Sequence, residues 1–183
     1  ASRLNQWDDN LIIRMKKGDE TAFEQSYRIL SPIIYSLVLR ICRNVETAND
    51  LTHDIFIHAF QNLKLYKTKN NFTAWVKKIA FNQTLNYIRK KSNTTHQELD
   101  IDSLTSLDCL PEVILHQHTL LEKLFSVISE TDRLVVWLYV AEQYTHGEIA
   151  ELLKMSPSYS KSIVARSLAK IRSHAKVKSY AHN

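Results

Sequence analysis

Glycine is almost absent from this chain of 183 residues, which contains only Gly18 and Gly147. A phosphate-cradling loop, a dinucleotide fingerprint and a nucleophile elbow each require closely spaced glycines, so none of these motifs is present. The scarcity of glycine therefore excludes most common enzyme signatures, and no other residue set supports catalysis. We expect a protein that is not an enzyme and that needs no cofactor.

Cysteine is also rare, and Cys42 and Cys109 lie far apart and outside any metal-ligand spacing. We expect reduced thiols rather than a disulfide framework, with Cys42 as a small core residue. The eight histidines form no metal-binding pattern, because their closest pairs do not share a helix face and no HExxH sequence occurs. No metal site is predicted.

Long apolar runs are missing as well. No segment approaches the run of about 20 apolar residues that a membrane-spanning helix needs, and the start of the chain shows no signal-peptide pattern. We therefore expect a cytoplasmic protein that does not insert into a membrane. The length allows one medium domain or two small ones, either of which can bury a core.

Acidic residues are absent from two long stretches of the chain. Residues 64–93 contain eight basic and no acidic side chains, and residues 154–183 contain seven basic and none acidic. Residues 94–153 between them contain two basic and eleven acidic side chains. Exposed helices ordinarily mix both signs, so the pattern favours two surfaces that face a polyanion, with nucleic acid as the first hypothesis. DNA, RNA and an anionic membrane fit this pattern equally, and a solvated helix face is the alternative for each run.

Few helix breakers and long runs at helical spacing predict an almost wholly α-helical chain. We expect one helix from Asp8 or Asp9 to Lys17 and, after a break at Gly18, another that begins at Asp19 and continues through Pro32. Further helices are expected over residues 47–64, 72–91, 112–128 and 132–142, and a loop over residues 64–71. Within residues 72–91 the periodicity places Trp75, Val76, Ile79 and Ala80 in the core, and leaves Lys77, Lys78, Phe81 and Asn82 nearer solvent.

The most specific local pattern is the T-x-x-E sequence at Thr145 and Glu148, which predicts a capping box at the start of a short helix. Lys154 and Met155 can then form a tight turn. Ser156 is expected to cap a further helix, with Pro157 in its first position. A short helix, a tight turn and a longer basic helix together make the helix-turn-helix arrangement.

A helical projection divides the last helix into two faces. The side expected to pack carries Ser160, Val164, Leu168 and Ile171. The opposite side, which would face a DNA major groove, carries Ser158, Tyr159, Ser162, Arg166, Ala169 and Lys170.

The best linker lies over residues 92–111, where polar and acidic residues replace the apolar repeats and a proline ends the segment. We place a first domain at residues 8–93, the linker at 94–111 and a second domain at 112–178. The expected fold class is all-α, with two small helical domains joined by an acidic linker. A structured acidic loop packed on one domain is the alternative.

The order of these parts resembles the extracytoplasmic-function (ECF) group of sigma-70-type RNA polymerase sigma factors. Gly18-Asp19, Ala22-Phe23 and Tyr27 are similar to the opening of region 2. Residues 48–60 resemble the helix of that region that docks on polymerase, and residues 72–82 resemble its promoter-opening segment. Residues 148–153 and 160–162 resemble region 4. The length suits members that keep only regions 2 and 4.

The resemblance implies a factor that binds core RNA polymerase and directs promoter recognition, −10 melting and transcription initiation for a stress or envelope regulon. The expected contacts with core polymerase come from Asp50, Leu51, His53, Asp54, Ile55 and Phe56. Those with the −10 element come from Tyr66, Lys67, Lys69, Asn70, Asn71, Phe72, Trp75, Lys78 and Asn82. Those with the −35 element come from Ser158, Tyr159, Lys161, Ser162, Arg166 and Lys170.

Side-chain chemistry ranks these residues. Opening a duplex needs aromatic rings that stack on unpaired bases, and we favour Tyr66 and Phe72 for this, since Trp75 has the spacing of a buried stripe. Arg166 is best able to bridge O6 and N7 of a guanine, whereas Lys161, Lys170 and Arg172 are expected to hold phosphates.

The resemblance also implies an anti-sigma protein as a second partner and a monomeric state within the holoenzyme. The acidic linker could follow a channel normally used by RNA, and simple solubility is the competing account. Departures from the family pattern at Asn86, Pro157, Ser158 and Ile163 leave the base preference open. Two other functions stay open: a dimeric helix-turn-helix repressor whose amino-terminal half senses a ligand, and a helical scaffold that binds only proteins.

Overall fold

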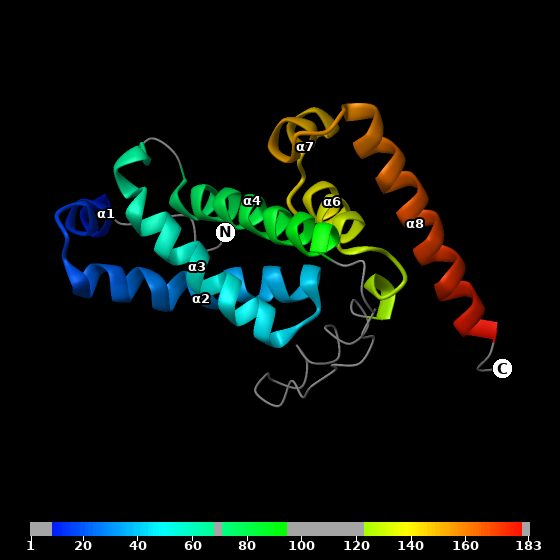
Figure 1. Cartoon of the computed structure of the whole chain (residues 1–183), viewed down its shortest axis with the longest axis horizontal. Helices are drawn as coiled ribbons and strands as arrows, with labels where there is room; N and C mark the ends of the chain where they lie inside the picture. The colour runs from blue at the N-terminus through cyan, green and yellow to red at the C-terminus, as the bar shows by residue number, and fades with distance from the viewer. Residues whose placement is uncertain (1–8, 68–70, 95–122, 181–183) are drawn as a thin grey trace. The chain divides into compact units, whose positions relative to one another are not determined.

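Helices are the only regular secondary structure in the described part of this computed structural model, which covers residues 9–67, 71–94 and 123–180, with backbone alone for residues 9, 94 and 176–180. The helices are α1 (Asp9–Lys16), α2 (Glu20–Cys42), α3 (Val45–Gln61), the 3-10 helix η2 (Leu63–Leu65), α4 (Phe72–Thr94), α6 (Glu130–Val140), α7 (His146–Leu153) and α8 (Pro157–Tyr180) (Figure 1). The all-α prediction is confirmed.

The chain divides into two compact units. One unit combines Ala1–Leu39 with Val45–Asn86, and the other combines Arg40–Asn44 with Tyr87–Asn183. The last residues of α2 and of α4 therefore belong to the second unit. The linker predicted at residues 94–111 lies outside the described residues apart from Thr94, so the predicted domain limits stay a prediction.

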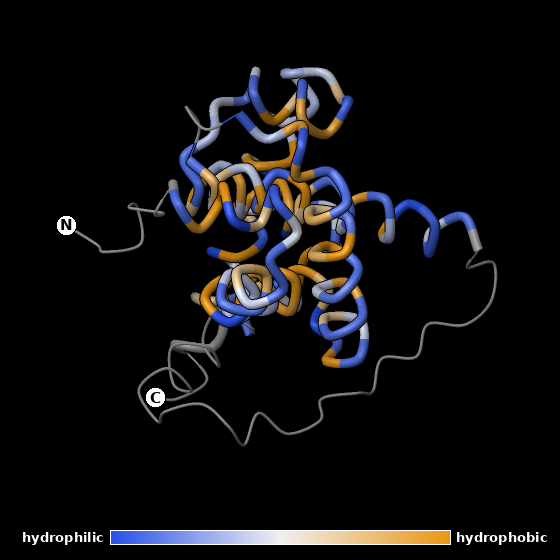
Figure 2. The backbone as a smooth tube through the Cα atoms, turned by 90° about the vertical axis from the view of Figure 1, so that its left-hand side faces the viewer, coloured by the Kyte–Doolittle hydropathy of each residue, from blue (hydrophilic) through white to orange (hydrophobic). Residues whose placement is uncertain are grey.

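Apolar residues recur along each helix between polar ones, as the hydropathy colouring shows (Figure 2). In the first unit, α2 packs on α3 through two aromatic pairs. The ring centroids of Phe23 and Phe60 lie 4.7 Å apart, and those of Tyr27 and Phe56 lie 4.8 Å apart. Ring pairs at such distances add to the gain from apolar burial. Phe56 is almost fully buried and anchors this contact.

The predicted break at Gly18 is confirmed, because its φ of 85° lies in the left-handed region that glycine adopts without steric cost. Asp19 then starts α2 as expected: the backbone amides of Thr21 and Ala22 donate to its Oδ1, at 3.0 and 3.3 Å. The helix continues through Pro32, as the sequence predicts. Cys42 is a buried, free thiol, which agrees with its predicted place in the core.

The second unit contains a helix-turn-helix formed by α7 and α8. Thr145 and Glu148 make the predicted capping box, in which each side chain accepts from the other residue's backbone amide. Lys154 then makes the turn in the left-handed region, with φ 51°. Ser156 Oγ accepts from the Tyr159 amide at 3.1 Å, and Pro157 is the first residue of α8, as predicted.

Several helix limits differ from the sequence prediction. The helix expected over residues 47–64 runs instead from Val45 to Gln61, and η2 includes the first two residues of the loop expected over residues 64–71. The helix expected from Asp132 begins at Glu130, because the side chain of Ser129 accepts a hydrogen bond from the Asp132 amide and so caps the helix earlier than expected. Residues 112–122 of another predicted helix lie outside the described part of the chain.

Candidate nucleic-acid interface

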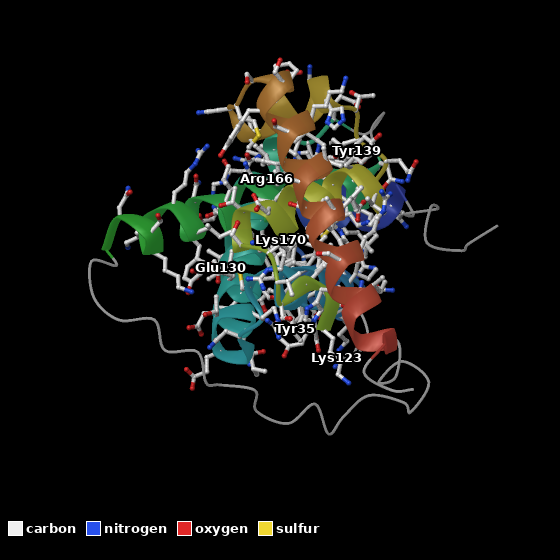
Figure 3. All side chains as sticks on the ribbon, turned by 90° about the vertical axis from the view of Figure 1, so that its right-hand side faces the viewer. Tyr35, Lys123, Glu130, Tyr139, Arg166 and Lys170 are labelled. Carbon is white, nitrogen blue, oxygen red and sulfur yellow. The ribbon has the colours of Figure 1, made fainter. Side chains whose placement is uncertain are left out.

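The exposed face of α8 carries the residues that the helical projection assigned to the major groove. All are exposed, namely Ser158, Tyr159, Ser162, Arg166, Ala169 and Lys170, and Lys161 is exposed beside them. On the opposite side Ser160 and Val164 are buried, and Leu168 is partly buried. The predicted division of α8 into two faces is therefore confirmed. Figure 3 labels Arg166 and Lys170, one turn apart on this helix.

Arg166 has two polar neighbours on this face. Its Nη2 donates to Asp132 Oδ1 at 3.3 Å, and it forms a further hydrogen bond with Tyr159. The nearby carboxylate raises the pKa of the guanidinium above its ordinary value. The side chain remains 56% exposed, so the ion pair leaves it open to solvent. Asp132 was not among the residues singled out from sequence.

His146 connects the two helices of the helix-turn-helix to α6. Its ring stacks on Tyr139 of α6, with centroids 4.6 Å apart and planes 10° apart. Its Nδ1 lies 3.1 Å from the hydroxyl of Ser160, which is fully buried in the first turn of α8. This hydrogen bond satisfies a buried polar group and fixes the start of α8 against α7. Sequence reasoning missed His146, since its three-dimensional neighbours leave no local pattern.

α3 also separates into an exposed and a buried face. Asp50, His53 and Asp54 are exposed together with Ile57, a large apolar side chain that is 43% exposed. The other three residues expected at a polymerase contact, Leu51, Ile55 and Phe56, are buried in the first unit. Their side chains are not available at its surface, so they contribute to such a contact only by supporting the exposed face.

The segment before α4 has its aromatic rings arranged differently from the prediction. Tyr66 and Phe72, which we expected to be available for bases, are 3% and 1% exposed. Trp75, expected in the core, is only partly buried. The three rings form one cluster: Tyr66 lies edge-on to Phe72 at 5.2 Å, and Phe72 stacks on Trp75 at 5.7 Å. Trp75 is thus the ring of the cluster nearest to solvent.

The polar residues expected around this cluster are mostly at the surface. Lys67, Asn71 and Lys78 are exposed and Asn82 is partly exposed, while Lys69 and Asn70 lie outside the described residues. Asn71 also caps α4, because its Oδ1 accepts from the Ala74 amide at 3.1 Å. Phe81, expected nearer solvent, is fully buried, so the predicted exposed side of this helix is wrong at that position. Its ring is large and apolar, so its burial in the core is favourable.

Lys16 of α1 is a second residue that sequence reasoning missed. Its Nζ donates to the Tyr66 carbonyl at 2.8 Å and lies 5.6 Å from the centre of the Tyr66 ring. This contact joins residues 50 positions apart. It ties α1 to Tyr66, the first residue of the aromatic cluster.

Two basic residues near the end of α4 have partners inside the second unit. Lys91 Nζ lies 3.0 Å from Glu130 Oε1, and Arg89 donates to the Leu153 carbonyl at 2.8 Å. In α6 the neighbouring Arg133 is buried, and burial lowers its pKa to about 10. These cations are therefore used at least partly for packing. The acid-free run as a whole is not one uniform binding surface.

Among the residues that the structure describes, no group of three or more histidine, cysteine, aspartate or glutamate side chains is placed to hold a metal ion. Within the same ranges, none of the helices combines the length and apolar character needed to cross a membrane.

The fold and the exposed basic face of α8 define an all-helical, helix-turn-helix protein, and comparison with known proteins identifies its family. Residues 27–94 match the family Sigma-70 region 2. The chain is 24% identical over 174 residues to the ECF RNA polymerase sigma factor SigW of Bacillus subtilis (strain 168), covering 88% of this chain and 92% of that protein.

Two solved structures share the fold. The chain in the structure of CnrH in complex with the cytosolic domain of CnrY gives a TM-score of 0.59 at 16% identity, covering 93% of this chain and 97% of that chain. The sigma factor RpoE in complex with the anti-sigma factor NepR, from Bartonella quintana, gives a TM-score of 0.58 at 20% identity, covering 85% of this chain and 97% of that chain.

Residues 27–94 therefore belong to the Sigma-70 region 2 family, and over most of its length the chain is similar to ECF sigma-70-type RNA polymerase sigma factors, as the resemblance predicted. Its likeness to these relatives supports the function of a sigma factor, a class whose members are not in general enzymes.

Proposed function

We propose that this sigma factor binds core RNA polymerase through α3 and brings two DNA-contacting surfaces to one promoter. The surface of α8 reads the −35 element, and the segment from Tyr66 to Asn82 engages and melts the −10 element. The observation that carries the proposal is the exposed face of α8, where no acidic residue of that helix offsets the basic side chains. An α-helix with such a face fits the major groove.

Arg166 is the base-reading residue in this proposal. A guanidinium presents a planar set of donors that matches O6 and N7 of a guanine, and a good pair of this kind gives about 1–3 kcal/mol of discrimination. Lys161 and Lys170 flank it on exposed positions of the same helix. They hold phosphates, which fix the register of the helix on DNA without reading sequence.

The −10 role is supported by rings and cations that occur together. Trp75 is partly exposed at the edge of the aromatic cluster, and Lys67 and Lys78 are exposed nearby in the sequence. Stacking of a base on an aromatic ring is worth about 1–3 kcal/mol, and this gain offsets part of the energy of opening the duplex. We therefore assign the first base contact to Trp75 and a supporting role to Tyr66 and Phe72.

The contact with polymerase is assigned to the exposed face of α3. Ile57 offers apolar surface between charged residues, with Asp50, His53 and Asp54 around it. An apolar centre with a polar rim is the usual composition of a protein–protein interface.

An anti-sigma factor is the second proposed partner, and it would hold the protein inactive in the bacterial cytoplasm until a stress or envelope signal arrives. The support is the likeness in fold to RpoE, whose structure contains the anti-sigma factor NepR, and to CnrH, whose structure contains the cytosolic domain of CnrY.

The test is transcription in vitro from a pool of genomic fragments, with purified core polymerase and this protein, followed by sequencing of the RNA 5′ ends. We expect defined start sites that share two upstream elements, and no start sites at these positions without the protein. Ile57→Arg should reduce binding to core polymerase, whereas His58→Arg, at the next exposed position, is the matched control.

Other outcomes would contradict the proposal. A dimer that binds a palindrome without polymerase would indicate a repressor, because a symmetric operator mirrors a symmetric protein. The lack of any salt-dependent affinity for DNA or polymerase would indicate a scaffold that binds other proteins.

A further inference from the structure

Asp132 lies in the first turn of α6 and contacts the residue proposed to read the −35 element. Its Oδ1 accepts from Arg166 Nη2 at 3.3 Å. The aspartate side chain is 17% exposed and the arginine side chain 56% exposed. The Asp132 amide donates to Ser129 Oγ at 3.1 Å, which fixes the turn that carries the carboxylate. A well-held carboxylate therefore restrains an arginine that extends into solvent.

The ion pair is not needed to hold α6 and α8 together. An apolar cluster already joins the two helices: Val136 is buried and Trp137 packs beside it from α6, and Leu168 and Ile171 pack against them from α8. Exposed ion pairs generally contribute little to stability. The ion pair between Asp132 and Arg166 therefore adds little to the stability of the contact between α6 and α8.

The geometry leaves the arginine able to bind a base. A guanidinium has five N–H donors in one plane; Asp132 accepts a hydrogen bond from Nη2, and Tyr159 forms one further hydrogen bond with the side chain. Two of the other donors suffice for O6 and N7 of a guanine. Holding a flexible side chain in its binding conformation before it meets its ligand reduces the entropy lost on binding.

The geometry points to Asp132 as a positioning residue that sets specificity: it holds Arg166 for one base pair of the −35 element. As a negative charge beside DNA it also lowers the attraction of this face for phosphates, so that affinity depends more on the base. The inference rests on the proposed reading of the −35 element by α8.

The experiment uses the holoenzyme and a promoter library with a randomised −35 element. Arg166→Ala identifies the position whose base preference depends on Arg166. We expect Asp132→Asn, which keeps the shape and removes the charge, to lower the preference at that same position by about two- to fivefold. Transcription from promoters with other bases at that position should stay unchanged or increase.

Glu130→Gln is the matched control, because Glu130 lies on the same helix with a similar exposure of 18% but pairs with Lys91 instead of Arg166. It should leave the base preference unchanged. If Arg166→Ala relaxes one position and Asp132→Asn does not, the inference is overturned and the proposed function stands.

A uniform loss of activity at all −35 sequences in Asp132→Asn also overturns the inference, because it indicates a structural role. If Arg166→Ala changes no base preference at all, the proposed reading of DNA by Arg166 fails, and the inference fails with it.

Discussion

At the scale of single residues, burial separates the side chains that support the proposed −10 surface from those that are exposed enough to contact DNA. Tyr66 and Phe72 have almost no exposed area, although their position in an acid-free run suggested base contact. Trp75, at the edge of the same cluster, keeps part of its ring exposed. A helical spacing predicts which residues share a face, but the elements around the helix decide which face is covered.

This difference predicts two distinct phenotypes in the aromatic cluster. Phe72→Ala should lower the free energy of unfolding by about 3–5 kcal/mol, because it leaves a cavity in a packed core. Trp75→Ala should lower open-complex formation by about tenfold or more, because one base loses its stacking partner. Its free energy of unfolding should fall less than that of Phe72→Ala. Urea denaturation and permanganate footprinting of the −10 element measure the two effects. The assignment is wrong if Trp75→Ala destabilises the protein as strongly as Phe72→Ala does but leaves melting of the −10 element unchanged at a temperature at which the variant is folded.

At the scale of elements, the junction between α1 and α2 depends on one carboxylate. Asp19 accepts hydrogen bonds from the Thr21 hydroxyl and from Arg14 Nε, both at 2.7 Å. The hydrogen bond from Thr21 and that from Arg14 lower the pKa of Asp19 from 3.8 to about 2. An acidic residue at a helix start stabilises it through the free amides and the helix dipole.

The lowered pKa predicts how this junction responds to acid. A carboxylate with a depressed pKa in the folded state contributes stability above its unfolded pKa, and this contribution is lost as the pH falls through the folded pKa. The free energy of unfolding should therefore fall between pH 3.8 and about 2. Asp19→Asn should be less stable near neutral pH and should show a smaller fall. Urea denaturation across this pH range measures the fall. If the free energy of unfolding changes with pH by the same slope in both proteins, the prediction is contradicted.

At the scale of the whole molecule, the two acid-free runs are not equivalent. On α8, Lys161 and Lys170 are exposed and belong to the face proposed to meet DNA. At the end of α4, Lys91 pairs with Glu130 and Arg89 with a backbone carbonyl. Net charge steers a protein toward DNA, but only cations that reach phosphates release counterions.

The salt dependence of promoter binding should reflect this distinction. Lys161→Ala and Lys170→Ala should each reduce the slope of log K against log salt by about 0.9, the value for one phosphate contact, with little change in sequence preference. Lys123→Ala, an exposed lysine outside both acid-free runs, is the control and should leave the slope unchanged. Equal slopes in wild type and all three variants would show that α8 does not bind phosphates. Holoenzyme binding to one promoter at several salt concentrations provides the measurement.

The sequence alone determined the class of fold and the helix-turn-helix. Gly18, the capping box at Thr145 and Glu148, and Ser156 with Pro157 each fix a helix end through contacts within a few residues, so local chemistry is sufficient to predict them. The two faces of α8 were also predictable, because one periodic helix packs on one side only.

Only the tertiary structure decided which side chains support the proposed surfaces. Asp132 lies 34 residues from Arg166, and Lys16 lies 50 residues from Tyr66. His146 is 14 residues from Ser160. Such contacts depend on how helices pack, and a helix face of a given composition is compatible with many neighbours. Sequence periodicity therefore predicts the faces, whereas packing selects the residues that position Arg166, Tyr66 and the start of α8.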